Sequence, residues 1–126
     1  MRNIVNTNKA PAAIGPYSQA IVAEGKLLFV SGQLGLDPES GILVEGGVRE
    51  QTIRAMENLT AILEAANSSL DKVIKVNVFL KNMSDFAVFN EIYGRYFPKE
   101  PPARAAIEVA GLPKDGLVEI ECVALV

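Results

Sequence analysis

The stretch of residues 48–66 constrains the fold of this chain more than any other. Apolar side chains recur there at intervals of three and four, the spacing that places them along one face of an α-helix. The members of this stripe are Thr52, Met56, Leu59, Leu63 and Ala66, with Ala55 and Ile62 beside them. Charged residues fall mostly on the opposite face. A helix that is apolar along one side must bury that side, so the remainder of the chain has to supply a surface for it.

Residues 73–81 predict such a surface, because their side chains alternate between two faces as in a β-strand. Ile74, Val76, Val78 and Leu80 face one way, and Lys75, Asn77, Phe79 and Lys81 face the other. A second helix is expected next, with Ser84 as its N-cap and an aromatic-rich stripe that reaches about Pro98. Further strands are expected at residues 3–5, 17–23 and 27–31. The order predicts one α+β domain over residues 1–126, a mixed β-sheet with both helices packed on one face.

Such an arrangement leaves the other sheet face uncovered. Phe79, Val123 and Leu125 would lie on it beside polar residues. A partly apolar face on so small a chain predicts a closed homo-oligomer with a site at the subunit boundary.

The last part of the chain, residues 101–126, carries the most specific chemistry. Pro101 and Pro102 disfavour a helix, and the alternation that follows places Arg104 at the entry of a strand. After a turn at residues 110–116, a second strand places Glu119 opposite to its apolar face. Two strands joined by a short turn predict a hairpin, which would bring Arg104 near Glu119. The hypothesis is that Arg104 receives a carboxylate ligand and that Glu119 lines the same site.

Residues that are absent narrow the chemistry further. The chain has no histidine, which excludes His-dependent catalytic triads and His-ligated zinc. Its single cysteine, Cys122, can form neither an internal disulfide nor a metal-binding thiolate cluster. No glycine-rich phosphate loop occurs. The sequence thus predicts no metal and no cofactor.

Charge and hydropathy bear on partners and location. The chain has 12 Lys and Arg against 15 Asp and Glu, a net charge of −3, and no basic run. This balance argues against nucleic-acid binding, which depends on clustered Lys and Arg. No stretch is apolar enough to span a membrane, and the N-terminus lacks the apolar core of a signal peptide. With one cysteine, the prediction is a cytoplasmic protein.

Three stretches together resemble the RidA (YjgF) family from end to end of the chain. They are AAIGPYSQA at residues 12–20, VSGQL at 30–34, and Pro102-Ala103-Arg104 with VEIE at 118–121. The resemblance implies a homotrimer of the chorismate-mutase-like α+β fold, with ligand clefts between subunits. It also implies hydrolysis of 2-imino acids, such as 2-iminobutanoate and 2-iminopropanoate, to a 2-keto acid and ammonia, without a cofactor.

The resemblance also implies roles for particular residues. Arg104 and Glu119 match the catalytic pair, and Tyr17, Ser31, Gly32 and Asn90, with Arg104, match the substrate-binding positions. One departure concerns Ala106, where many members carry a cysteine. Because Cys122 is expected on the face opposite to Glu119, no thiol is expected in this site.

Other interpretations stay open at this stage. Arg104 has a structural alternative, an ion pair with Glu119 or Glu121. The same arginine would equally serve a non-catalytic binder or sensor of small carboxylates. A translation inhibitor or endoribonuclease is a third function associated with the family, and the acidic balance and missing histidine argue against it.

Overall fold

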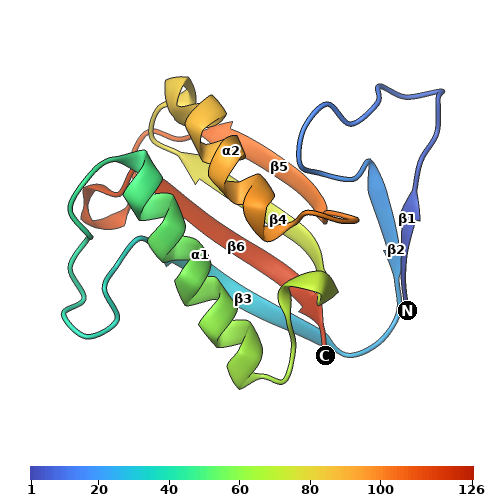
Figure 1. The fold of residues 1–126 in the computed structure, drawn as a ribbon, viewed down its shortest axis with the longest axis horizontal. Helices are drawn as coiled ribbons and strands as arrows, with labels where there is room; N and C mark the ends of the chain where they lie inside the picture. Colours follow the sequence, from blue (N-terminus) through green and yellow to red (C-terminus); the bar gives the residue numbers. More distant parts are fainter.

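A computed structural model describes all of residues 1–126, and it shows two helices and two β-sheets (Figure 1). The strands are β1 (Arg2–Val5), β2 (Ala20–Ala23), β3 (Leu27–Leu34), β4 (Val73–Leu80), β5 (Ala103–Glu108) and β6 (Val118–Leu125). The helices are α1 (Val48–Ala65) and α2 (Phe86–Tyr96). Short 3₁₀ turns occupy Leu70–Lys72, Met83–Asp85 and Pro113–Asp115. The α+β class predicted from the sequence is confirmed.

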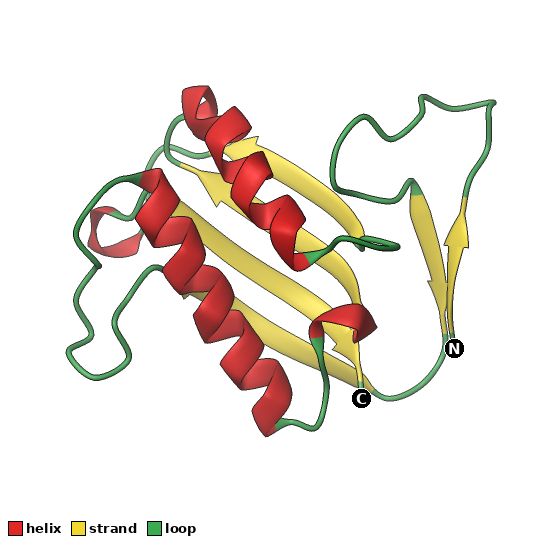
Figure 2. Cartoon of the chain, in the orientation of Figure 1, coloured by secondary structure: helices red, strands yellow, loops and turns green.

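Both helices pack on the same face of a four-stranded sheet, as predicted (Figure 2). The apolar stripe of α1 is buried there, with Met56, Leu59 and Leu63 fully inaccessible to solvent. At the start of α1 the side chain of Glu50 accepts a hydrogen bond of 2.9 Å from the Gly47 amide. This contact satisfies one of the amides that helix geometry leaves unpaired. Helix α2 begins one residue later than expected, since Asp85 is its N-cap and Ser84 lies in the preceding 3₁₀ turn.

The predicted hairpin of the last two strands is wrong. The sheet has the order β3-β6-β4-β5, so β4 lies between β5 and β6. Strand β5 pairs in parallel with β4, and β6 pairs antiparallel with both β3 and β4. The strands β1 and β2 form a separate antiparallel pair.

The strand order has a physical reason in the helix that joins β4 to β5. A strand, a helix and a strand in succession form a βαβ unit, whose two strands pair in parallel. Strand β5 is short and follows two prolines, and these features suit a sheet edge. Strand β6 is apolar on the helix side, with Val118 and Ile120 fully buried, and so it occupies the centre.

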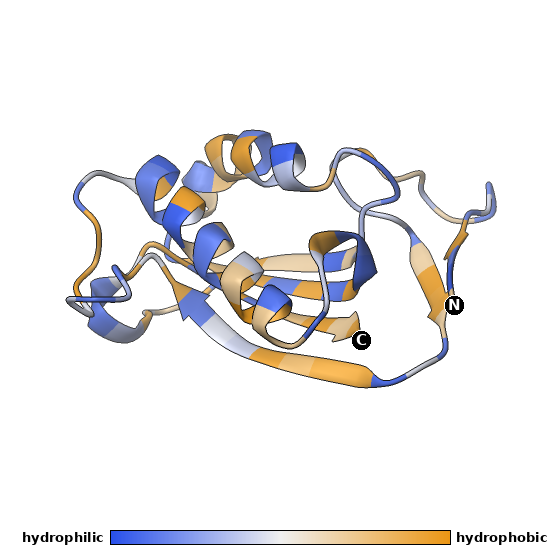
Figure 3. Cartoon of the chain, turned by 60° about the horizontal axis from the view of Figure 1, so that its bottom comes forward, coloured by the Kyte–Doolittle hydropathy of each residue, from blue (hydrophilic) through white to orange (hydrophobic).

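The face of the sheet away from the helices is uncovered in the single chain (Figure 3). Strand β3 presents apolar residues on this open face: Phe29 is 72% exposed and Leu27 is 51% exposed. Ile107 on β5 is half exposed. An exposed apolar surface of this kind is unfavourable in water, which suggests that another surface covers it. Neither helix combines the length and hydropathy that crossing a bilayer requires.

Candidate active site

Arg104 lies on β5 with its side chain on the helix-covered side of the sheet. Its Cα partner on β4 is the fully buried Val76, and paired residues in a sheet point to the same face. Helix α2 crosses above this position. Its residues Phe86, Asn90 and Tyr93, spaced by four and three, form the stripe that meets the guanidinium.

The guanidinium of Arg104 sits among three aromatic rings and one amide. Its Nη1 donates a hydrogen bond of 2.6 Å to Asn90 Oδ1. The rings of Tyr93, Tyr17 and Phe86 have their centroids 5.1, 5.5 and 5.6 Å from Cζ. These distances allow cation–π attraction, which partly replaces the lost hydration of the cation. Burial lowers the pKa of Arg104 from its ordinary value, but an arginine stays charged at neutral pH.

No carboxylate neutralises Arg104 within its own chain. The three ion pairs of the chain join Arg49 and Arg95 to Glu91, and Arg54 to Glu57. The bond to Asn90 is the only hydrogen bond that the Arg104 side chain makes. The structural alternative considered for Arg104, an ion pair with Glu119 or Glu121, is therefore not formed in this chain. A half-buried cation with free donors is a favourable place for an anionic ligand.

Tyr17 reaches Arg104 from the segment between β1 and β2. This segment runs beside β5, where the Ser18 amide donates to the Pro102 carbonyl at 3.2 Å and Ser18 pairs with Ala103. The Tyr17 hydroxyl accepts a hydrogen bond of 3.4 Å from the Ile14 amide. Its own proton has no acceptor in the chain, so the hydroxyl can donate to a bound molecule.

Glu119 lies on β6 with its side chain on the open face of the sheet. It alternates there with the buried residues Val118 and Ile120. Its carboxylate lies over Gly32, so closely that a Cβ at Gly32 would stand 2.0 Å from Glu119 Oε1. The pairing of β3 with β6 is irregular between Val30 and Gln33, and Ser31 is exposed within this irregular segment. Gly32 thus provides the space for the carboxylate.

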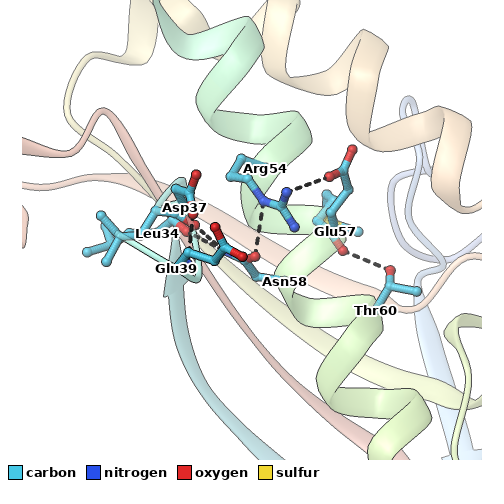
Figure 4. A network of polar contacts seen from close by, with 9 residues as sticks. Leu34, Asp37, Glu39, Arg54, Glu57, Asn58 and Thr60 are labelled. Atoms are coloured by element: carbon cyan, nitrogen blue, oxygen red, sulfur yellow. Dashed lines mark hydrogen bonds and ion pairs between the residues drawn. The ribbon is translucent and has the colours of Figure 1, made fainter. Parts of the chain in front are cut away.

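The end of β3 near this carboxylate is tied firmly to α1 (Figure 4). Asn58 Nδ2 donates to the carbonyl oxygens of Leu34 and Leu36 at 3.2 and 2.9 Å. Asn58 Oδ1 in turn accepts from Arg54 Nε at 3.1 Å. Leu34 on β3 is the Cα partner of Glu119 on β6, so this network holds the strand segment against which Glu119 pairs.

The predicted residues therefore form two groups, and one chain does not bring the groups together. Arg104, Asn90 and Tyr17 meet on the helix side, whereas Glu119 and Gly32 lie on the open face, where Ser31 is exposed beside them. On β4, Arg104 is level with Val76 and Glu119 with Phe79. One intervening strand and three residues of rise place their Cα atoms on the order of 14 Å apart, on opposite sides of the sheet. The expected proximity of Arg104 and Glu119 is wrong within a single chain.

Two aromatic residues beside Arg104 were not predicted as site residues. They are Phe86 and Tyr93, and both belong to the aromatic-rich stripe expected for the second helix. Tyr93 is fully buried, its hydroxyl has no hydrogen-bond partner, and burial raises its pKa far above the ordinary range. Their spacing of three and four residues from Asn90 was the available signal.

Ala106 follows Arg104 on the same face of β5 and packs against the core. Cys122 is 4% exposed on the helix side of β6, opposite to Glu119, as expected.

Cavities of about 400 and 410 Å³ lie beside α1 and beside the loop before β6, and neither includes a predicted site residue. The chain has no group of three or more Cys, Asp or Glu arranged to hold a metal ion.

The chain is similar to known proteins over nearly its whole length. Residues 7–126 match the family described as Endoribonuclease L-PSP. The chain belongs to this family, which is also named RidA or YjgF. A RutC family protein of Pyrococcus horikoshii is 53% identical over 124 residues, which are 98% of each chain. The 2-iminobutanoate/2-iminopropanoate deaminase of Bos taurus is 50% identical over 125 residues, covering 99% of this chain and 90% of the relative.

Solved structures of RidA proteins have the same fold. The crystal structure of RidA from the Antarctic bacterium Psychrobacter is 49% identical and superposes with a TM-score of 0.78. The match covers 98% of this chain and 99% of that one. The resemblance seen in three short motifs thus extends over nearly the whole chain.

Proposed function

We propose that this RidA protein is a hydrolytic deaminase of small 2-imino acids such as 2-iminobutanoate and 2-iminopropanoate. One observation carries the proposal: Arg104 is a half-buried cation with free donors and no carboxylate partner. The relatives named as deaminases of these two compounds support the choice of substrate. The single cysteine suits a reducing compartment such as the cytoplasm.

In this proposal Arg104 holds the carboxylate of the substrate. Asn90 occupies Nη1, and the other N–H groups of the guanidinium have no protein acceptor. Two of them can bind the planar carboxylate by parallel hydrogen bonds. The adjacent C=N group is then fixed in position, and Tyr17 is near enough to donate a hydrogen bond to the substrate or to water.

The chemical step needs a group that accepts a proton, and Glu119 is the proposed one. Its carboxylate takes a proton from water as the oxygen attacks the imine carbon, which gives a tetrahedral carbinolamine. Glu119 returns this proton to the nitrogen, which completes the carbinolamine. It then carries the hydroxyl proton to the nitrogen as the C–N bond breaks, so that ammonia leaves and the 2-keto acid forms. One water is consumed for each ammonia released.

Because Arg104 and Glu119 lie on opposite faces of one sheet, the proposed site needs two chains. The open face with Phe29 and Glu119 would pack against a neighbouring copy in a homotrimer, and Arg104 of that copy would complete the cleft with Ser31 and Gly32. The apolar character of this face supports its burial between subunits. The family resemblance supports three copies rather than two.

The test is the rate of 2-ketobutanoate formation from freshly generated 2-iminobutanoate. We expect the protein to accelerate the reaction over buffer, and Arg104→Ala to reduce kcat/KM on the order of 100-fold, since two charge-assisted hydrogen bonds are lost. Arg95→Ala is the matched control, because Arg95 is exposed and pairs only with Glu91.

Two results would point to other functions. If the protein binds 2-ketobutanoate through Arg104 without accelerating hydrolysis, it is a carboxylate binder rather than an enzyme. If it instead cleaves RNA, with salt-dependent binding, the endoribonuclease description of the family applies.

A further inference from the structure

The loop of residues 7–16, between β1 and β2, lies next to the Arg104 group although it has no regular secondary structure. Residues 6–15 are all exposed in the single chain, so packing within the chain does not hold this loop in place. A Cβ added at Gly15 would be 3.7 Å from both the Asn90 amide nitrogen and the Tyr17 ring. The loop therefore borders the proposed site, and its shape must come from hydrogen bonds.

Gln19 supplies most of these hydrogen bonds from a single side chain. Its Oε1 accepts from the Thr7 amide at 2.7 Å, and its Nε2 donates to the carbonyl oxygens of Thr7 and Pro11 at 3.0 and 2.6 Å. A longer contact of 3.4 Å reaches the Ala10 carbonyl. The amide thus links positions 8 to 12 residues away, and only an uncharged amide has both the acceptor and the donors for this set.

The residues next to Gln19 connect this loop to Arg104. Ser18 is buried, and its hydroxyl donates to the Pro101 carbonyl while its amide bonds to Pro102. Tyr17, one residue earlier, covers the guanidinium and receives the Ile14 amide of the loop on its hydroxyl. Tyr17 is thus held from two sides: by the backbone through Ser18 and by the loop that Gln19 folds.

We propose that Gln19 is a positioning residue that keeps Tyr17 over Arg104 by closing the loop of residues 7–16. Gln19 does not touch the substrate. Its effect on catalysis rests on the proposed function, in which Tyr17 donates a hydrogen bond in the cleft. Loss of the Gln19 amide frees the loop and leaves Tyr17 in the correct place for only part of the time.

The experiment compares Gln19→Ala, Gln19→Glu and the control Thr7→Ala in the full protein. Gln19→Ala removes every contact of the Gln19 amide with the loop. Gln19→Glu keeps the acceptor for the Thr7 amide but sets a carboxylate against the carbonyl oxygens of Thr7, Ala10 and Pro11. Thr7→Ala deletes a side chain of the same loop that bonds only the Lys9 amide, and it keeps the backbone contacts with Gln19. Hydrogen exchange of the loop amides and the kinetics of imine hydrolysis are measured for each.

We expect the hydrogen-bonded loop amides of Thr7 and Ile14 to exchange at least tenfold faster in Gln19→Ala, and the Ile14 amide to do so in Gln19→Glu. In both variants kcat/KM should fall on the order of tenfold. Thr7→Ala should match the wild type in kinetics and in the exchange of all loop amides except that of Lys9, whose acceptor it removes. The melting temperature should change little, because the loop is exposed and the core is untouched. In a Tyr17→Ala background, Gln19→Ala should cost almost nothing more, since the residue acts through Tyr17.

The proposal is overturned if loop exchange is unchanged in Gln19→Ala, or if the losses of Gln19→Ala and Tyr17→Ala multiply. An inactive wild type would instead refute the proposed function. In that case faster loop exchange, with weaker binding of 2-ketobutanoate in Gln19→Ala but not in Thr7→Ala, still supports the positioning role, and unchanged exchange still overturns it.

Discussion

Arg104 combines features that a purely structural arginine does not need. It is partly desolvated, it lies among three rings, and its one hydrogen bond goes to an uncharged amide. A buried cation is usually paired with an anion, because burial of an isolated charge is unfavourable. Here the protein replaces part of the lost hydration with aromatic faces and leaves donors free. This arrangement favours reversible binding of a carboxylate.

Asn90→Asp tests whether the proposed ligand binding at Arg104 depends on the absence of a carboxylate partner. A carboxylate in place of Oδ1, 2.6 Å from Nη1, would form an internal ion pair with Arg104. The dissociation constant of 2-ketobutanoate should then rise on the order of tenfold or more, while the melting temperature holds or rises. Calorimetric titration and thermal denaturation measure the two quantities.

Asn90→Ala is the control for that substitution. It removes the same acceptor without adding a charge, so its effect on ligand affinity should be smaller than that of Asn90→Asp. Equal weakening by both variants would mean that the amide positions Arg104 and that neutrality is irrelevant.

Cys122 should be chemically inert in the folded protein. It is 4% exposed, and burial raises its pKa from 9.0 to about 12, so on the order of one molecule in ten thousand carries a thiolate at pH 8. A colorimetric thiol reagent at pH 8 should detect no cysteine until denaturant is added. Rapid native labelling, with loss of activity, would contradict this assignment.

The raised pKa of Cys122 also predicts how the free energy of unfolding changes with pH. The pKa of Cys122 is higher in the folded protein than in the unfolded chain. Burial of the neutral thiol therefore stabilises the fold fully below about pH 9, and this stabilisation is lost as the pH rises toward 12. In urea titrations, Cys122→Ala should therefore lose less free energy of unfolding than the wild type between these two values. Parallel curves for the two proteins would show that the thiol does not contribute.

At the scale of elements, two glycines allow close contacts at and just after the end of β3. Gly32 lies against Glu119 of β6, and Gly35 lies against Gln51 of α1. At Gly32 an added methyl group meets the flexible end of Glu119, whereas at Gly35 it meets the Gln51 backbone at 2.7 Å. Side chains can rotate away, but the backbone of a packed helix cannot. Substitutions at the two positions should therefore separate the proposed role of Glu119 in catalysis from the stability of the fold.

Gly32→Ala should lower kcat/KM about tenfold or more by displacing Glu119, with little change in melting temperature. Gly35→Ala should instead destabilise the fold by about 1–3 kcal/mol through overpacking. Kinetics and thermal denaturation of both variants check the pair. A Gly32→Ala variant with normal kinetics would show that the position of Glu119 does not matter.

The sequence was sufficient for the elements but not for their order in the sheet. The stripe with Met56 and Leu59 and the alternation predicted for residues 73–81 are local patterns. The stripe is confirmed, and the alternation is confirmed from Lys75 to Leu80, after a register shift between Val73 and Lys75. The pairing of β5 with β4 is a contact across α2, and no local pattern distinguished it from a hairpin with β6. Only the βαβ rule applied to residues 73–108 would have indicated it.

For the site residues, too, the sequence indicated single contacts but not how the strands arrange them in the sheet. Asn90 meets Arg104 because a helix directly precedes its strand, and Gly32 meets Glu119 because β3 pairs with β6. The face on which each group lies follows from strand order, so the error in the hairpin became an error in the proximity of Arg104 and Glu119. The Gln19 contacts had no periodic signal at all.

At the scale of the whole molecule, the open face is the main feature that one chain leaves unexplained. Phe29 and Leu27 are largely exposed on it, and the proposed catalytic Glu119 stands among its residues. Burial of this face between copies would remove the apolar surface from water and bring Glu119 opposite to another chain's Arg104.

Phe29→Glu should therefore dissociate the assembly and abolish activity together, as light scattering and the imine assay would show.

Mixing two variants that are each expected to be inactive tests the proposed shared site most directly. Arg104→Ala and Glu119→Gln subunits are unfolded, mixed in equal amounts and refolded, and imine hydrolysis is compared with that of each variant alone. If every site takes Arg104 from one chain and Glu119 from another, about a quarter of the sites receive both intact residues, and about a quarter of wild-type activity returns. If both residues act within one chain, every site lacks one of them, and the mixture stays as inactive as its components.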